Sequence, residues 1–301
     1  MRTPLLAIIL LALAAPSALA GSCTSKATGS WNGGTATTWN AGCTGTGGSP
    51  AAGDTVTIST GTTVTVNASG AAATSVTVAG VNSATTLLQI NTGFSLAVSG
   101  NVTISNGATS TNRTTRLLLQ AGAQLTAGSL TITNSTQAGS VADLRLTGDP
   151  ATLVTVNGAI VFTGGAPLPS ITFTGTGGTL QVAGSVDNDG TLTPAGGTVV
   201  YNGSGAQNLG TYTYNNLTIS KSGGTATATG NVTAASLTFA AANAGLVSMS
   251  AGTLSESYTK MYVSRSFTIV TQLLPMAPKL KKATPKIAKP VSFASVSSIM
   301  K

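Results

Sequence analysis

The chain has 301 residues, including 37 glycines, and only 7% of its residues are charged, against about 25% in ordinary globular proteins. It contains no histidine, which excludes Ser-His-Asp and Cys-His catalysis, histidine-ligated metal sites and the commonest general base. The formal net charge of +8 arises from residues 260–301, which hold eight basic and no acidic residues, whereas residues 21–259 are close to neutral.

The N-terminus has the features of a secretory signal peptide. Met1-Arg2 is basic, Leu5–Ala15 is apolar, and Ala18-Leu19-Ala20 is a small-residue cleavage motif. The apolar run is too short to span a bilayer. We therefore expect residues 1–20 to be removed on export, leaving no transmembrane segment in a mature chain that is extracellular, on the cell surface or, alternatively, periplasmic. Lipidation at Cys23 is a weaker alternative, because Ala20-Gly21-Ser22 lacks the aliphatic residue of a lipobox.

Residues 21–52 are predicted to form an N-terminal cap. Cys23 and Cys43 are the only cysteines, and in an exported chain such a pair indicates a disulfide. Closing this loop would stabilise the fold by about 3 kcal/mol. Trp31 and Trp39, the only tryptophans, lie inside the loop. They are expected to cover the open end of the first strand layer, and a sugar-stacking platform that contacts glycans is the alternative.

The stretch Gly53–Asn67 contains two short runs in which aliphatic and hydroxyl residues alternate. Alternation places successive side chains on opposite faces of a strand, so Val56 and Ile58, and then Val64 and Val66, are predicted to start a core. Asp54, at the head of the stretch, is interpreted as a turn residue.

Residues 53–252 continue this pattern as a repeat domain of strands and turns. The glycines at 100, 128, 158, 184 and 230 each follow one strand and precede an aliphatic residue that starts the next, at separations of 28, 30, 26 and 46 residues. One turn of a parallel β-helix takes roughly 20–30 residues, so the last gap would hold two turns. We therefore predict an all-β, right-handed parallel β-helix, or solenoid. One or two β-sandwiches are the alternative, although a sandwich core normally needs more aromatic residues.

The predicted strands after the first pair are Ser75–Val78, Thr86–Ile90, Ser95–Val98, Val102–Ser105, Arg116–Gln120, Ser129–Thr133, Leu144–Leu146, Leu153–Val156, Ala159–Thr163, Ser170–Thr174, Thr179–Val182, Thr198–Tyr201, Thr211–Tyr214, Leu217–Ser220 and Ser236–Phe239.

Two stretches carry a resemblance to known proteins. Trp31, Trp39 and Cys43 followed by PAAGDTVTI, and GGTVVYNGSGAQNLGTYTYNNLTIS at Gly196–Ser220, are similar to units of secreted bacterial β-strand-repeat surface proteins. That group includes adhesin passengers and large secreted proteins encoded near mannose-sensitive haemagglutinin pilus genes. The resemblance covers about Gly21 to Ala240. It implies a parallel β-helix or related repeat fold at the cell surface, and it carries over no catalytic residues.

Two groups of charged residues are candidate sites. Asp187-Asn188-Asp189-Gly190 could hold Ca²⁺, but it lacks the further acidic ligands, so an ordinary turn is favoured. Arg113, Arg116 and Arg145 are candidates for the base of a β-helix polysaccharide lyase, although Asp143 and Arg145 more simply form a surface ion pair on one strand face.

Outward threonines such as Thr55, Thr57, Thr63 and Thr65 resemble ice-binding faces, which need a strict register. The variable repeat spacing predicts that no such register is kept.

Residues 253–301 form a basic, Lys/Pro-containing tail that is expected to be disordered, with Pro275–Pro290 extended and solvated. It could tether anionic polymers. The favoured interpretation is instead a disordered end with no such role, or a truncated or shifted reading frame in place of further repeats.

These observations predict an exported, non-enzymatic surface protein, structural or adhesin-like, with no catalytic, cofactor-binding or metal-binding residues. Its expected partners are surface glycans or other surface proteins, with no specific nucleic acid. A carbohydrate-active β-helix enzyme and an accessory protein for pilus or envelope assembly are the alternatives.

Overall fold

The structure is a computed structural model that describes residues 20–81, 85–107, 109 and 111–240, together with the strand segments 246–249, 254–256, 262–263 and 269–271. The chain divides into two units, Met1–Thr271 and Gln272–Lys301, and the fold described below is that of the first unit. The expected signal peptide up to residue 19 and the tail from residue 272 lie outside the described residues.

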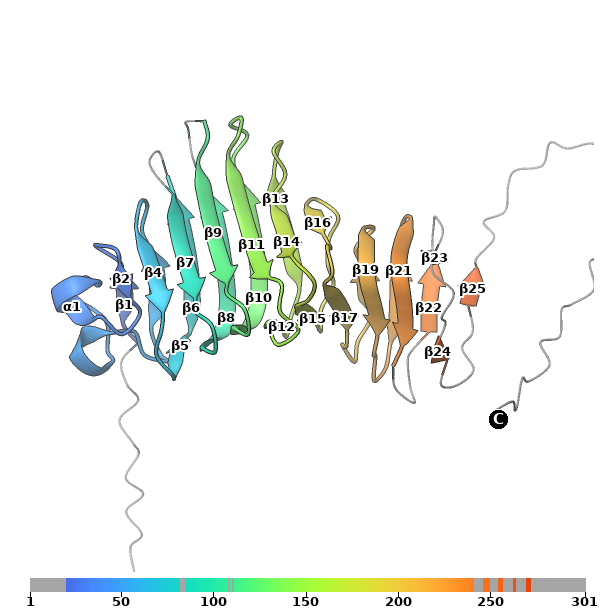
Figure 1. Ribbon diagram of the computed structural model, residues 1–301, viewed down its shortest axis with the longest axis horizontal. Coiled ribbons are helices and arrows are strands. Elements are labelled where there is room, and N and C mark those ends of the chain that lie inside the picture. Colours follow the sequence, from blue (N-terminus) through green and yellow to red (C-terminus); the bar gives the residue numbers. More distant parts are fainter. Residues whose placement is uncertain are drawn as a thin grey trace, which may run out of the picture. The chain divides into compact units, whose positions relative to one another are not determined.

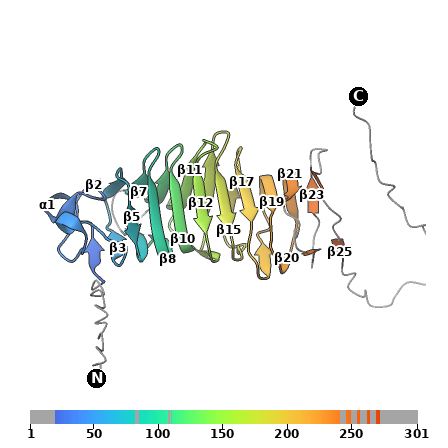
Figure 2. The ribbon, with the colours of Figure 1, turned by 90° about the horizontal axis from the view of Figure 1, so that it is seen from below.

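All pairings between the strands are parallel, and they stack side by side from the first strand to the last (Figure 1, Figure 2). The chain winds repeatedly through the same three faces, which we name A, B and C in the order in which each turn visits them. This arrangement confirms the parallel β-helix, and the β-sandwich alternative is wrong because sandwiches are built from antiparallel sheets.

Face A begins at the cap. Each of its strands pairs with the next, except that β13 and β18 are joined through a bridge at Val186. The strands are β1 (Ser22–Thr24), β3 (Thr55–Ile58), β6 (Ser75–Gly80), the second part of β8 (Ser95–Asn106), the second part of β10 (Gln124–Asn134), β13 (Ile160–Gly164), β18 (Gln207–Leu209), β20 (Thr225–Ala228), β22 (Leu246–Met249) and β25 (Ile269–Thr271).

Faces B and C complete each turn. Face B begins with β2 (Gly29–Ser30), β4 (Thr63–Val66), β7 (Thr86–Ile90), β9 (Thr114–Leu119), β11 (Val141–Thr147), β14 (Ser170–Thr174) and β16 (Thr191–Thr193). It continues with the first part of β19 (Thr213–Ile219), the first part of β21 (Val232–Phe239) and the whole of β23 (Leu254–Glu256). Face C consists of β5 (Ala71–Ala73), the first parts of β8 and β10, β12 (Leu153–Val156), β15 (Thr179–Val182), β17 (Thr198–Tyr201), the second parts of β19 and β21, and β24 (Tyr262–Val263). Two short helices, α1 (Gly34–Thr37) and η1 (Thr46–Gly48), lie in the cap.

Most of the core consists of aliphatic side chains that stack from turn to turn. On face A, Val56 pairs with Val76, which pairs with Val102, and the row continues through Leu130 to Ile160. Each of these side chains is at most 2% exposed. Because a single turn cannot bury its own inner face, this stacking supplies the core that each turn lacks alone.

The glycines of the sequence repeat form a column where face C turns into face A. A Cβ on Gly100 would lie 2.7 Å from the Thr74 carbonyl oxygen, one on Gly128 would lie 2.4 Å from that of Ser99, and one on Gly158 would lie 2.6 Å from that of Gly128. Gly184 continues the column, since its Cβ would lie 2.5 Å from the Gly158 carbonyl oxygen. Each corner therefore fits only glycine, because consecutive turns touch there through their backbones.

The fifth glycine does not belong to this column. Gly230 precedes the face B part of β21 and lies against Thr211, whereas Gly203 stacks on Ala183 at the next corner of the column. The gap between Gly184 and Gly230 does hold two turns, but Gly230 lies at the corner before face B and not in the glycine column. The same dipeptide, Gly-Asn, thus occurs at two different corners, as Gly100-Asn101 and as Gly230-Asn231.

Replacing Gly128 by alanine is expected to lower the free energy of unfolding by about 1–3 kcal/mol, because the new methyl group would overlap the carbonyl oxygens of Ser99 and Gly100. Gly53→Ala is the matched control, since nothing lies within 4 Å of the position its Cβ would take. Urea unfolding followed by circular dichroism measures both, and equal midpoints for the two variants would contradict the corner contact.

Strands β23, β24 and β25 lie within residues 253–301, which the sequence suggested to be tail. They pair with β21 and β22, so the pattern of paired strands extends to Thr271. In the part of the chain that the structure describes, no helix is long and apolar enough to cross a membrane.

Candidate functional site

The outer surface of face A carries a row of threonines in register. Alternation along each strand turns one threonine outward in β1, β3, β6, β8 and β10, and parallel pairing places each beside the next. The row consists of Thr24, Thr57, Thr77, Thr103 and Thr131, and Val161 follows it. Neighbouring strands are about 4.8 Å apart, so the hydroxyl and methyl groups repeat at that interval.

Two further rows flank the threonines. One consists of Ser22, Thr55, Ser75, Asn101 and Ser129, and the other of Ala79, Ser105, Thr133 and Thr163. Asn101 donates from Nδ2 to Thr103 Oγ1 at 2.8 Å and accepts from Ser129 Oγ at 3.0 Å. No position in the three rows is charged. We call these rows the polar array of face A.

The polar array corrects one sequence argument. Variable repeat spacing was expected to break the register of the outward threonines, but the register is kept from β1 to β10. The variation in length falls in the corners and in faces B and C, where connections can lengthen without moving the strands of face A. Spacing along the sequence therefore does not measure register in this fold.

Charged residues gather instead on face B. Asp143 on β11 is 1% exposed and accepts from Arg116 Nε at 2.6 Å and from Arg145 Nη2 at 3.1 Å. The pairing of Asp143 with Arg145 was predicted from their positions on one strand face. The sequence did not connect Arg116 with this pair, because Arg116 lies on a different strand, β9, where parallel pairing makes it the neighbour of Asp143.

The arginines proposed as catalytic bases are thus placed unequally. Arg116 and Arg145 hold a buried carboxylate, whereas the backbone carbonyl of Arg113 accepts from Asn106 Nδ2 at 3.1 Å and from Val141 N at 2.6 Å. The guanidinium groups of Arg116 and Arg145 are thus engaged with the Asp143 carboxylate. The cluster stabilises the outer surface of face B by pairing charges across strands.

The segment Asp187–Gly190 is a side-chain-pinned turn. Asp187 accepts from the backbone N–H of Phe162 at 2.8 Å and of Asp189 at 3.3 Å, and Asn188 Oδ1 accepts from Thr211 N at 2.6 Å. Burial raises the pKa of Asp187, the two hydrogen bonds lower it, and the nearby charge of Asp189 raises it, so the net shift is upward. Among the described residues, no group of three or more His, Cys, Asp or Glu side chains could hold a metal ion.

The resembling stretch Gly196–Ser220 is occupied with internal contacts. Tyr201 and Tyr214 are buried, with their hydroxyl oxygens 3.1 Å apart, and Tyr201 also accepts from Gly210 N at 3.0 Å. Gln207 donates to the carbonyls of Val182 and Gly184 at 3.0 and 2.8 Å. The polar residues of this motif therefore satisfy buried backbone groups, which is a structural role.

Lys221 is a buried cation that the sequence did not single out. It is fully buried, and its ammonium donates to the carbonyl oxygens of Gly203 and Gly205 at 3.1 and 2.7 Å and to Gln207 Oε1 at 2.6 Å. Burial lowers the pKa of Lys221. The three acceptors come from a single corner, so the side chain fastens that corner to the following turn.

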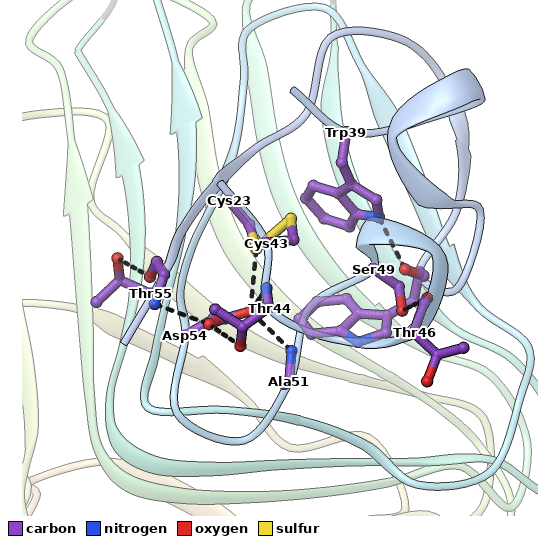
Figure 3. The surroundings of a disulfide bond; sticks show 11 residues. Cys23, Trp39, Cys43, Thr44, Thr46, Ser49, Ala51, Asp54 and Thr55 are labelled. Atoms are coloured by element: carbon purple, nitrogen blue, oxygen red, sulfur yellow. Dashed lines mark hydrogen bonds between the residues drawn. A yellow bond between two sulfur atoms is a disulfide. The ribbon is translucent and has the colours of Figure 1, made fainter. Parts of the chain in front are cut away.

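The cap is built around a disulfide and a buried carboxylate (Figure 3). Cys23 and Cys43 are bonded, which confirms the predicted disulfide. Asp54 is fully buried beside it and accepts from Thr44 N, Ala51 N and Gly21 N, each at 2.9 Å, and from Thr44 Oγ1 at 2.7 Å. Burial acts to raise the pKa of Asp54, but the hydrogen bonds from Thr44, Ala51 and Gly21 outweigh it, so the pKa lies below its ordinary value.

Trp31 and Trp39 pack inside the cap. They are 3% and 0% exposed, their ring centroids are 5.6 Å apart in an edge-to-face arrangement, and Trp39 Nε1 donates to the Trp31 carbonyl at 2.8 Å. Both rings therefore have a packing role at the end of the solenoid. Stacking of either ring on a sugar would require the cap to open.

Together, fold and surface define a class, a parallel β-solenoid with a disulfide-bonded cap and a neutral hydroxyl-rich face. Comparisons with family models, with curated proteins and with solved structures each found no match.

Proposed function

We propose that the protein is an exported, non-enzymatic surface protein, structural or adhesin-like, that binds extended glycans through the polar array of face A. The observation that carries this proposal is the register of the array: outward hydroxyl groups repeat without a charged residue from β1 to β10. A periodic polymer can contact many such groups at once, and multiple weak contacts add up to useful avidity.

The chemistry elsewhere supports a binding role over catalysis. Asp54 and Asp143 are buried and fully engaged, the first with backbone and hydroxyl donors and the second with two arginines. The hydroxyl and amide groups of the array can donate and accept hydrogen bonds but do not titrate near neutral pH. They therefore suit recognition of neutral sugar hydroxyls.

The test is binding to insoluble polysaccharides such as cellulose, chitin and peptidoglycan, measured as depletion of the protein from solution, with released reducing ends measured in the same tubes. Thr77→Glu, which introduces a bulky charge into the centre of the array, is expected to weaken binding at least about tenfold, the effect of losing roughly 1.4 kcal/mol. Thr65→Glu on face B, at a similarly half-buried outward position, is the matched control and should bind like the unmodified protein.

Two outcomes would overturn the proposal. Equal weakening by both substitutions would remove the array from the binding surface. Release of sugar products by the unmodified protein would favour the carbohydrate-active enzyme instead. Circular dichroism of each variant shows whether the strands remain folded.

A further inference from the structure

Gly21, the second of the described residues, is held in the fold by its backbone. Its carbonyl accepts from Thr55 N at 2.9 Å, and its N–H donates to Asp54 Oδ1 at 2.9 Å. The preceding residue, Ala20, is exposed. Among the described residues, which begin at Ala20, backbone contacts with the cap start at Gly21, the residue that follows the Ala18-Leu19-Ala20 cleavage motif.

Asp54 is a buried carboxylate whose described partners are all neutral. Thr44, Ala51 and Gly21 supply three backbone N–H groups and one hydroxyl, and the Cys23 sulfur, which carries no proton in the disulfide, lies 3.4 Å from Oδ2. Among the described residues, Asp143 is the carboxylate in both side-chain ion pairs. Burying an ionised carboxylate is costly, and a cation within hydrogen-bond distance would offset much of that cost.

The position leaves space only for a glycine. A Cβ on Gly21 would lie 2.1 Å from the Gly42 carbonyl oxygen and 2.7 Å from Asp54 Oδ1. The Gly42 backbone cannot give way easily, because it belongs to the loop that the Cys43 disulfide holds in place. The nitrogen of Gly21 is thus fixed against the carboxylate by its own chain and by the cap.

We propose that removal of residues 1–20 places the new α-ammonium group of Gly21 on Asp54 and so locks the cap with a buried ion pair. The step is hydrolysis of the Ala20–Gly21 peptide bond by a signal peptidase. Water supplies the hydroxyl that completes the Ala20 carboxyl group, the C–N bond breaks, and the released amine takes up a proton. The nitrogen that donates to Asp54 as an amide then donates as an ammonium. This inference rests on the export that forms part of the proposed function.

The charge of the new terminus gives the ion pair a pH signature. An α-amino group ordinarily has a pKa of about 7.7–8.0, and a carboxylate at hydrogen-bond distance raises it. A raised folded-state pKa stabilises the folded cap below the ordinary value, and the stabilisation is lost as the pH rises through the raised value. The groups packed around the pair are the Thr44 hydroxyl, the disulfide sulfurs and backbone groups of Gly42 and Ala51, none of which titrates in this range.

The test compares two purified proteins that carry the same net charge, one starting at Gly21 and one starting at Ala20. In the second protein the ammonium lies one residue farther out, and an amide N–H faces Asp54. We expect the cap of the Gly21 protein to melt at a higher temperature at pH 7, measured by tryptophan fluorescence, which reports only the cap because Trp31 and Trp39 are the only tryptophans. The difference should vanish in an Asp54→Asn background and above the raised pKa.

A second measurement does not depend on whether the Asp54→Asn variant is stable. Acylation of the Gly21 amine in the folded protein at pH 7 should be at least about tenfold slower than in urea, because an opposite charge at this distance shifts a pKa by about one unit or more. Equal melting of the two proteins, or equal acylation rates, would overturn the ion pair. These measurements use no glycan. The mass of the chain recovered outside a bacterial host tests export and the cleavage position separately from glycan binding, and a terminus other than Gly21 would overturn the processing step.

Discussion

Leu117→Ala is expected to lower the free energy of unfolding by about 2–5 kcal/mol, the range found when a fully buried leucine is truncated. Leu117 is 0% exposed on β9, and its neighbours in register are Leu88 on β7 and Leu144 on β11, both equally buried. Removing its branched end would leave a cavity between two turns, because the rows on either side are fixed by their backbone pairing. Urea unfolding monitored by circular dichroism measures the loss.

Leu118→Ala is the matched control, since the same side chain is truncated one residue farther along the same strand. Leu118 points outward on face B, half-buried between Gln89 and Arg145, and its truncation should cost below about 1 kcal/mol. A larger loss for Leu118 than for Leu117 would mean that β9 is shifted by one residue, because such a slip exchanges the two faces of a strand.

The same pair of residues shows where sequence patterns lose their meaning. At Thr55–Ile58 hydroxyl and aliphatic residues alternate, and the predicted inward positions, Val56 and Ile58, are confirmed as buried. At Leu117–Leu119 three leucines follow one another, and nothing in the pattern tells inward from outward. The structure resolves this through register with β7 and β11, which is a relation between segments about thirty residues apart.

Contacts between distant segments also explain what the sequence missed in the candidate sites. The separations of 33 and 10 residues between Asp54 and its partners Gly21 and Thr44 follow no local rule, so Asp54 was interpreted only as a turn residue. Lys221 is held by a corner 14 to 18 residues earlier. By contrast, the disulfide could be predicted, because the chain contains just two cysteines.

The sequence did not predict the register of the polar array, for a related reason. The prediction from sequence assumes that aligned threonines require repeats of equal length. In a solenoid each strand aligns with its neighbour through backbone hydrogen bonds, and insertions in a corner leave that alignment intact. Thr57, Thr77 and Thr103 are unequally spaced along the chain yet adjacent in space.

Asp54→Asn is expected to destabilise the cap by at least about 1–3 kcal/mol, the cost of leaving one buried donor unpaired. The carboxylate accepts a backbone N–H on each oxygen, from Gly21 on Oδ1 and from Thr44 and Ala51 on Oδ2. An asparagine can turn its amide either way, but in both orientations its NH₂ group faces an N–H donor. Tryptophan fluorescence during urea unfolding measures the loss, because both tryptophans are in the cap.

The pH dependence follows from the direction of the pKa shift. The folded-state pKa of Asp54 lies below its ordinary value, so its contribution is fully present above the unfolded-state pKa and is lost as the pH falls through the folded-state pKa. The unmodified cap should therefore lose stability in acid, below about pH 4. The Asp54→Asn cap should be weak at all pH values and show little of this acid transition.

Asp149→Asn is the control for the substitution itself. Asp149 accepts a single backbone N–H, from Ala151 at 2.7 Å, in an exposed turn, so either amide orientation can be relieved by water. Its effect on urea unfolding should be below about 1 kcal/mol. If the two substitutions cost the same, or if the acid transition persists unchanged in Asp54→Asn, then the carboxylate of Asp54 does not hold the cap together, and the disulfide and the two tryptophans would have to account for its stability.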